Sequence, residues 1–192
     1  MRLKKLIIAD EKLVFDDRIK IRKAEISGID SNDQSVSFSR LKIDREDAAA
    51  VLLWDPAREK VILIRQYRYA VANDAGEALI ELVAGKLDGD EDPLHAAIRE
   101  TEEEAGYRIN PARIKKLCSY YASPGYTSET YHLFLAEVSE QDRISVGGGL
   151  EQENEYIERI EMGVQQFISE CRNGIIKDGK TVMSSFYLEQ LV

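Results

Sequence analysis

The sequence has 192 residues, of which 44% are hydrophobic and 32% are charged, and its formal net charge is −9. This length and balance suit a globular protein with one sizeable core, or one domain and a small appendage. The excess of acidic residues argues against nucleic acid as a partner, because binding its backbone needs an excess of Lys and Arg. The longest uninterrupted apolar run, residues 48–54, is too short to span a bilayer, so we expect no membrane partner.

The amino-terminal residues and the cysteines predict the compartment. Nothing near Met1 resembles a signal peptide, because the short apolar patch at residues 6–9 ends at Asp10. Neither Cys118 nor Cys171 has a neighbouring His at a spacing typical of metal sites, so we predict that both are buried free thiols. Together these features predict a cytoplasmic protein.

Residues 1–45 are predicted to form a small antiparallel β subdomain. Segments 3–9, 12–26 and 35–43 have the composition of strands, and turn-forming residues occupy 28–33. Polar and apolar residues alternate at 18–22, as in a half-buried strand. The subdomain has too few apolar residues for a core of its own, so we predict that it packs in a dimer interface.

From Glu46 onward the strand patterns become more fully apolar, and helical patterns follow them. The spacing of apolar and turn residues predicts strands at 48–54, 60–68, 78–84, 114–122, 130–138 and 156–162, and helices at 165–172 and 181–191.

Residues 85–107 (GKLDGDEDPLHAAIRETEEEAGY) are predicted to form a loop, a helix of about four turns and a stop. Asp92 is a favourable N-cap, and Pro93 suits the first helical position, where its missing N–H costs nothing. Gly106 stands where a left-handed C-terminal cap is needed.

Three carboxylates of this helix are predicted to crowd together. At about 100° per residue, Glu100, Glu103 and Glu104 fall on one side, next to an apolar face. Like charges at such spacings repel one another by about 0.2–0.5 kcal/mol per pair on an exposed helix. The cluster therefore predicts a bound cation, and hard divalent ions with oxygen ligands fit best, Mg²⁺ first and Mn²⁺ second.

The same segment resembles a known motif, the Nudix box. Every fixed position of that motif is filled, by Gly85, Glu91, Arg99, Glu100, Glu103, Glu104 and Gly106. Chance agreement at these positions is on the order of 10⁻⁸ per starting point. A solvated acidic helix would explain the glutamates but not Gly85, Glu91 and Arg99 at their spacing. The resemblance implies the α/β Nudix fold, an α/β/α sandwich with a mixed sheet, for residues 46–192, beside the amino-terminal β subdomain of residues 1–45.

Other segments resemble particular groups within the Nudix hydrolases. Ser123–Pro124–Gly125 with Glu129, and the strand IRQYR at 64–68, are similar to ADP-ribose and sugar-nucleotide pyrophosphatases. Residues 147–158 (GGGLEQENEYIE) and 177–181 (KDGKT) resemble the bacterial GDP-mannose pyrophosphatase family more specifically. That family works as a domain-swapped homodimer whose amino-terminal strands help to cover the partner's substrate. The resemblance therefore implies a homodimer in which residues 1–45 are exchanged.

The chemistry implied is hydrolysis of a pyrophosphate, whose charged oxygens repel a nucleophile until metal ions neutralise them. Glu100 and Glu104, one turn apart, are the natural metal ligands, and Glu103 fits as a third or bridging ligand. The family also uses the carbonyl at the position of Ala84. Arg99 is expected to orient a carboxylate, and Gly85 to allow the backbone to turn.

The general base must come from elsewhere in the chain. By analogy with the ADP-ribose enzymes, Glu153 would be the base and Glu155 a further metal ligand, with Glu129 as the competing base. The alternative for the 151–155 loop is a solvated acidic run.

Three cations are predicted to bind substrate. Arg68 could grip a phosphate and Lys180 could hold the terminal phosphate or sugar, unless each is an ordinary surface residue. Arg40 fits a residue that acts across the dimer interface. Arg18 stands where the GDP-mannose pyrophosphatases have an aromatic residue that stacks on the base, so the base preference stays open.

The leading functional hypothesis is Mg²⁺-dependent hydrolysis of nucleoside diphosphate sugars, GDP-mannose first, to a nucleoside monophosphate and a sugar 1-phosphate. ADP-ribose, cleaved to AMP and ribose 5-phosphate, is the alternative substrate. A Nudix-fold sensor that binds such a ligand without cleaving it is the alternative from another class. Sensors of that kind usually lose box carboxylates, and here all are present.

Overall fold

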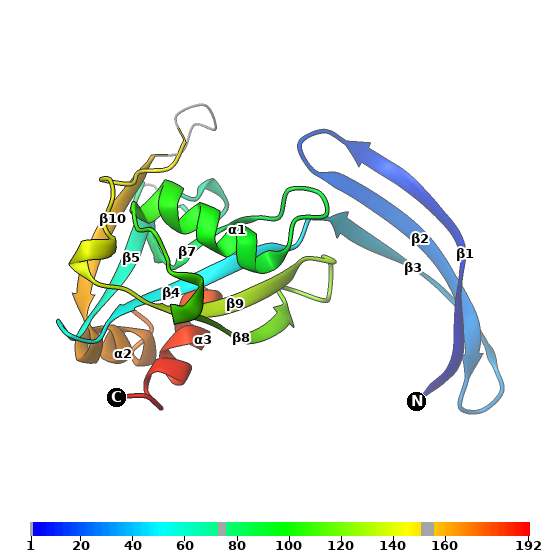
Figure 1. Ribbon diagram of the computed structural model, residues 1–192. Coiled ribbons are helices and arrows are strands. Elements are labelled where there is room, and N and C mark those ends of the chain that lie inside the picture. The colour runs from blue at the N-terminus through cyan, green and yellow to red at the C-terminus, as the bar shows by residue number, and fades with distance from the viewer. Residues whose placement is uncertain (1, 73–75, 151–155) are drawn as a thin grey trace. The chain divides into compact units, whose positions relative to one another are not determined.

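The computed structural model describes residues 2–72, 76–150 and 156–192 (Figure 1). The chain divides into two compact units. We call Met1–Asp47 with Tyr121–Thr130 the N-terminal unit, and Ala48–Tyr120 with Tyr131–Val192 the main unit.

The N-terminal unit contains an antiparallel sheet of three long strands, β1 (Leu3–Asp16), β2 (Lys20–Asp30) and β3 (Ser35–Asp44), in that order. The predicted strand at 12–26 is wrong, because the chain turns between β1 and β2. At this turn Asp17 N donates to Ile19 O at 3.2 Å, and Arg18 N donates to Asp17 Oδ1 at 2.7 Å. Short acidic side chains favour turns by bonding to nearby backbone groups. The alternation of polar and apolar residues at 18–22 indicated a continuous strand instead.

The segment 121–130, which carries the Ser-Pro-Gly sequence, is bonded to the end of β3. Ile43 N donates to Tyr126 O at 2.7 Å, and Thr130 N donates to Asp47 Oδ1 at 2.9 Å. Arg45 also pairs with Glu129 at 3.4 Å. These bonds explain why the segment groups with the N-terminal strands although it is far from them in sequence.

Within the described residues, the main unit is built on a seven-stranded sheet with three helices. Its elements are β4 (Ala48–Asp55), β5 (Lys60–Gln66), β6 (Leu79–Glu81), β7 (Val83–Lys86), α1 (Pro93–Glu100), β8 (Ile114–Tyr121), β9 (Thr130–Glu137), β10 (Ile157–Gly163), α2 (Val164–Arg172) and α3 (Gly179–Leu188). Short 3₁₀ turns lie at Tyr69–Val71, Pro111–Arg113 and Glu140–Asp142.

The sheet is mixed, as predicted. Its strand order is β10-β5-β4-β9-β8, with β6 paired to β5 and β7 paired to β4. β4 runs parallel to β9 and antiparallel to β5, and β5 runs antiparallel to β10. The predicted strand at 78–84 is divided at Leu82 into two strands. β6, before Leu82, pairs with β5, and β7, after it, pairs with β4.

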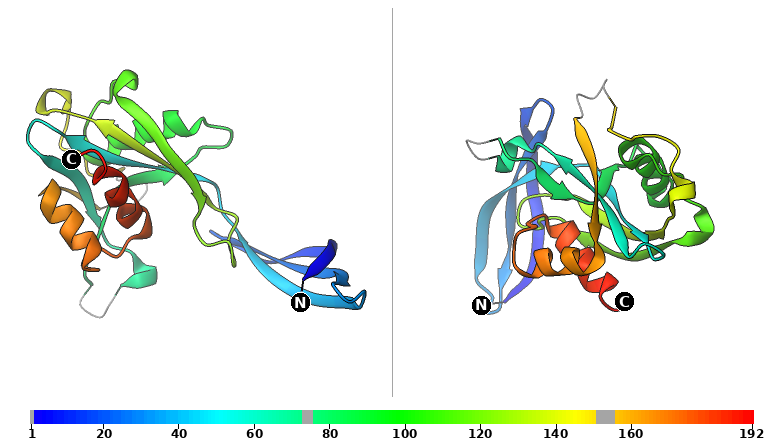
Figure 2. Two further views of the ribbon diagram at one scale, coloured as in Figure 1. Left: turned by 90° about the horizontal axis from the view of Figure 1, so that it is seen from below. Right: turned by 90° about the vertical axis from the view of Figure 1, so that its left-hand side faces the viewer.

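Side chains of β4 alternate between two hydrophobic cores. Ala49 and Val51 belong to the core under α1, whereas Ala50 and Leu52 belong to the core under α2 and α3. Figures 1 and 2 show α1 on one face of the sheet and the other two helices on the opposite face. The predicted α/β/α sandwich is therefore confirmed.

Both cysteines are free thiols. Cys171 is buried as predicted, but Cys118 is only half-buried, because it lies on β8, an outer strand of the sheet. No helix in the described part of the chain is long and apolar enough to cross a membrane.

Candidate active site

The box helix begins and ends where the sequence predicts. Asp92 caps α1 by accepting a bond from Leu94 N at 2.9 Å, Pro93 is the first helical residue, and Gly106 has the left-handed φ of 72°. The prediction of one uniform α-helix is wrong, because residues Thr101–Ala105 form a π-helical turn in which Gly106 N–H bonds to Thr101 O. π-Helical turns are rare in proteins, and those that occur often lie at functional sites. The extra residue in the turn changes the directions of its side chains.

Two glutamates of the box are buried against the segment that precedes the helix. Glu100 is 9% exposed and Glu104 is 2% exposed. Glu104 Oε2 accepts a hydrogen bond from Ala84 N at 3.0 Å. Glu100 lies so close to Gly85 that a Cβ at that glycine would stand 1.8 Å from Glu100 Oε1.

This contact gives a different reason for glycine at position 85 from the predicted one, which was a turn of the backbone. Gly85 does not have a positive φ, so the backbone turn itself does not require glycine. What requires it is the close approach of the Glu100 carboxylate, which any side chain at position 85 would block.

Arg99 is the centre of a hydrogen-bonded network on the box. Its Nη1 donates to Glu100 Oε1 at 2.6 Å and to Glu103 Oε2 at 3.2 Å. Its Nη2 donates to Glu91 Oε2 at 2.9 Å and to Lys86 O at 3.1 Å. The hydrogen bond to Arg99 holds the pKa of the Glu91 carboxyl below its usual value. Glu91 thus binds the same arginine that bonds to Glu100 and Glu103, a contact that the motif alone does not reveal.

The donor chemistry of the box fits a hard divalent cation, because its side chains are carboxylates. Among the residues that the structure describes, no three His, Cys, Asp or Glu side chains already form a cluster that could hold a metal. Arg99 and the Ala84 N–H bond to the box carboxylates. Glu155, a predicted metal ligand, and Glu153, the predicted base, lie outside the described residues.

The structure brings two other predicted site residues, Arg68 and Lys180, together on one carboxylate, Glu81. Arg68 Nε donates to Glu81 Oε1 at 2.7 Å, and Arg68 Nη2 donates to Oε2 at 3.2 Å. Lys180 Nζ donates to the same Oε2 at 2.5 Å and to Asp178 Oδ1 at 3.0 Å. Lys180 is buried, so the alternative of an ordinary surface lysine is wrong.

Sequence reasoning missed Glu81, although a signal was present. It is a carboxylate inside the apolar run of residues 79–84 (LIELVA), and it is only 2% exposed. A buried carboxylate needs a cationic partner, so its position in that run predicts one. Burial tends to raise the pKa of Glu81, but the bonds and charges of Arg68 and Lys180 outweigh it and hold the pKa below its ordinary value.

One segment, Leu79–Lys86, connects the cation pair to the box. It carries Glu81, the Ala84 N–H that binds Glu104, and Gly85, which abuts Glu100. Burial tends to lower the pKa of Arg68, but the hydrogen bond to Glu81 and the charges of Glu81 and Glu104 outweigh it and raise the pKa. The cations and the carboxylates of this region therefore act on one another electrostatically.

The remaining predicted residues belong to the N-terminal unit. Arg40 lies on β3, donates to Ser39 O at 2.9 Å and stacks over the Phe38 ring at 4.5 Å. Glu129 pairs with Arg45, and Arg18 lies in the turn between β1 and β2. Their predicted roles stay predictions.

Comparison with known proteins identifies the family. Residues 44–176 match the model of the NUDIX domain. The chain is 35% identical over 187 residues to the GDP-mannose pyrophosphatase of Citrobacter koseri, a match that covers 96% of this chain and 95% of that protein. It is also 37% identical over 181 residues to the GDP-mannose pyrophosphatase of Cronobacter sakazakii, covering 93% of this chain and 92% of the relative. With the box and the sandwich fold, these matches show that the chain belongs to the Nudix hydrolase family.

Proposed function

We propose that this Nudix hydrolase cleaves the pyrophosphate bond of nucleoside diphosphate sugars, with GDP-mannose preferred and Mg²⁺ as the metal. A water oxygen attacks one phosphorus, and the bridging oxygen leaves with the other phosphate. The products are a nucleoside monophosphate and a sugar 1-phosphate. The observation that carries this proposal is the complete set of box carboxylates, in which Glu100 is buried against Gly85 and Glu104 is buried at the Ala84 N–H. The chain that carries this box resembles GDP-mannose pyrophosphatases over nearly its whole length.

The metal would be held by Glu100, Glu104 and the Ala84 carbonyl, with Glu103 as a bridging ligand and Glu155 as a further one. When bound, it neutralises the pyrophosphate oxygens and lowers the pKa of the attacking water. Arg99 orients Glu100 and Glu103 from one guanidinium nitrogen.

The substrate's charged groups would be held by Arg68 and Lys180. We assign the general base to Glu153, with Glu129 as the competing candidate. The complete box supports an enzyme over a sensor that only binds the ligand, because each carboxylate of the metal site is present.

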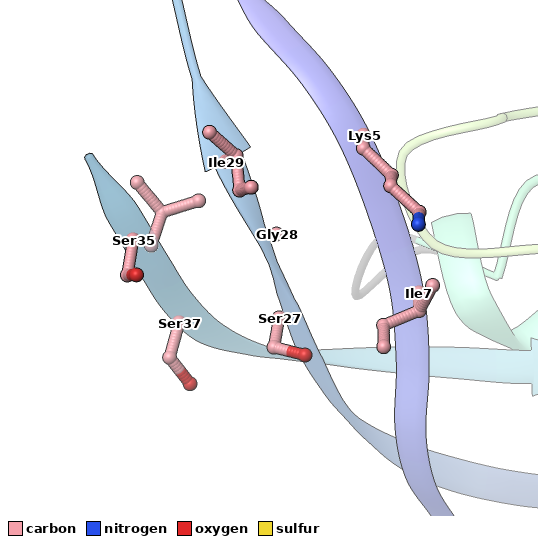
Figure 3. Close-up of a pocket in the computed structure, with 8 residues that line it drawn as sticks. Lys5, Ile7, Ser27, Gly28, Ile29, Ser35 and Ser37 are labelled. Atoms are coloured by element: carbon pink, nitrogen blue, oxygen red, sulfur yellow. The ribbon is translucent and has the colours of Figure 1, made fainter. Parts of the chain in front are cut away.

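We further propose that the protein is a homodimer in which residues 1–45 are exchanged and residues 46–192 form the Nudix domain. Large apolar side chains of β1, among them Leu6, Ile7 and Phe15, are exposed in the single chain. A hollow of about 450 Å³ also opens on the three-stranded sheet, between Ile7 and Ile29 and beside Gly28 (Figure 3). A second copy would cover this surface and place Arg40 near the partner's substrate.

A substrate panel tests the proposal. Nucleoside diphosphate sugars, ADP-ribose, dinucleotides and nucleoside triphosphates would be ranked by kcat/KM with Mg²⁺ or Mn²⁺, and the products identified. We expect GDP-mannose to rank first, ADP-ribose to be cleaved as well, and triphosphates to be poor. A triphosphate as the best substrate would overturn the assignment.

A further inference from the structure

We propose that Glu81 is a positioning residue that aims the guanidinium of Arg68 at the substrate's diphosphate. This inference rests on the proposed function, in which Arg68 binds a phosphate. Glu81 does not itself need to touch the substrate; it acts through the arginine.

The contact geometry supports this role. A carboxylate that accepts two parallel bonds from one guanidinium fixes its plane as well as its position. The Arg68–Glu81 pair is of this kind, since Nε and Nη2 each bond to a different carboxylate oxygen. Nη1 is not part of the fork, and the side chain of Arg68 remains 41% exposed whereas that of Glu81 is 3% exposed. The buried partner is therefore the fixed point, and the arginine is the group that can meet a ligand.

Glu81 is itself held by a second cation, Lys180. Lys180, in the first turn of α3, bonds to Glu81 Oε2, and its ammonium also lies 5.9 Å from the centre of the Tyr131 ring. The helix start that carries Lys180 is fixed by Asp178, which accepts from Thr181 N at 3.1 Å. Leu82, directly after β6, donates its N–H to Thr181 Oγ1 at 2.9 Å and so links this segment to α3. These bonds prevent the carboxylate from following the arginine into solvent.

Charge gives a second reason for a carboxylate at this position. Arg68 and Lys180 would repel each other if they met without it, and a buried cation without a partner is strongly destabilising. With Glu81 between them, both cations can stay charged at neutral pH. An amide at position 81 would keep the shape but would offer a single acceptor, so it could not hold both arms of the fork.

A double-mutant cycle tests this inference. Glu81→Gln, Arg68→Gln and the double variant would be compared with the wild type in kcat and KM for GDP-mannose. We expect Glu81→Gln to raise KM about tenfold, as the loss of one charge-assisted bond predicts, with a much smaller change in kcat. The loss in the double variant should be clearly smaller than the product of the two single losses, because Glu81 acts through the arginine. Losses that multiply, or an unchanged KM in Glu81→Gln, would overturn the inference.

Two further variants distinguish an effect on substrate binding from a loss of folding. Glu81→Asp keeps the charge but shortens the side chain by one methylene, so it should fold and still raise KM; an unchanged KM would count against the inference. Glu158→Gln is the matched control, because Glu158 pairs with Arg65 at 2.7 Å in an exposed pair across β5 and β10, and its KM should not change. A wild-type protein that cleaves no nucleoside diphosphate sugar would instead overturn the proposed function.

Discussion

The two units of the chain differ in how they use their apolar residues. In the main unit, β4 and β5 are buried on both faces, and two hydrophobic cores separate the sheet from its helices. In the N-terminal unit, Asp30 is the only buried residue among residues 2–47. The main unit can be stable by itself, whereas the N-terminal unit exposes the apolar surface that would normally form a core.

This difference indicates which unit suits catalysis and which suits association with a partner copy. The box carboxylates need fixed positions, and they are held by buried contacts to Gly85, the Ala84 N–H and Arg99. The N-terminal sheet offers a broad surface, which suits a partner copy better than a catalytic constellation.

The largest effect is expected at the box. Glu100→Gln or Glu104→Gln should lower kcat by about 10²-fold or more, because each removes a charge that would ligate the metal. Glu102→Gln is the matched control on the same turn, since the side chain of Glu102 is 42% exposed and pairs with Arg108. Steady-state kinetics at saturating Mg²⁺ would decide, and near-normal turnover of both variants would refute the site.

The close approach at Gly85 predicts the next effect. Gly85→Ala should lower kcat/KM by about tenfold or more, because its Cβ would displace the Glu100 carboxylate. Gly163→Ala is the control, since nothing lies within 4 Å of a Cβ there. If both alanine variants retain full activity, the carboxylate does not depend on that glycine.

The N-terminal sheet gives a prediction about assembly. Ile7→Lys should weaken self-association about tenfold or more by burying a charge in the interface, while the main unit unfolds at nearly the same temperature. Lys12→Gln, on the same strand, should have little effect. Light scattering at micromolar concentrations measures this, and a wild-type monomer there would contradict the proposed dimer.

A smaller effect is expected from pH. The pKa of Glu81 is lower in the folded chain than its ordinary value of 4.5. Its contribution to stability is therefore complete above that ordinary value and is lost as pH falls through the folded-state pKa. The midpoint of thermal unfolding should fall as pH is lowered below about 4.5, and less steeply in Glu81→Gln. Parallel curves for the two proteins would show that Glu81 does not contribute.

The sequence predicts those features that depend on local chemistry. The N-cap at Asp92, the left-handed Gly106 and the apolar strands of the main unit follow from residue types and short spacings. The position of Glu81 in an apolar run predicts a cationic partner but does not identify it, because Arg68 and Lys180 are brought to Glu81 only by the fold. The π-helical turn also escapes prediction, since an i to i+5 bond leaves no clear pattern in five residues.

We expect this Nudix hydrolase to cleave a pyrophosphate bond only when a divalent metal is bound at the box. The most direct measurement is ³¹P NMR of GDP-mannose incubated with the wild-type protein, with Mg²⁺ and then with a chelator. We predict that GMP and mannose 1-phosphate appear only while the metal is available. Release of GDP and free mannose, or equal cleavage after chelation, would contradict the account.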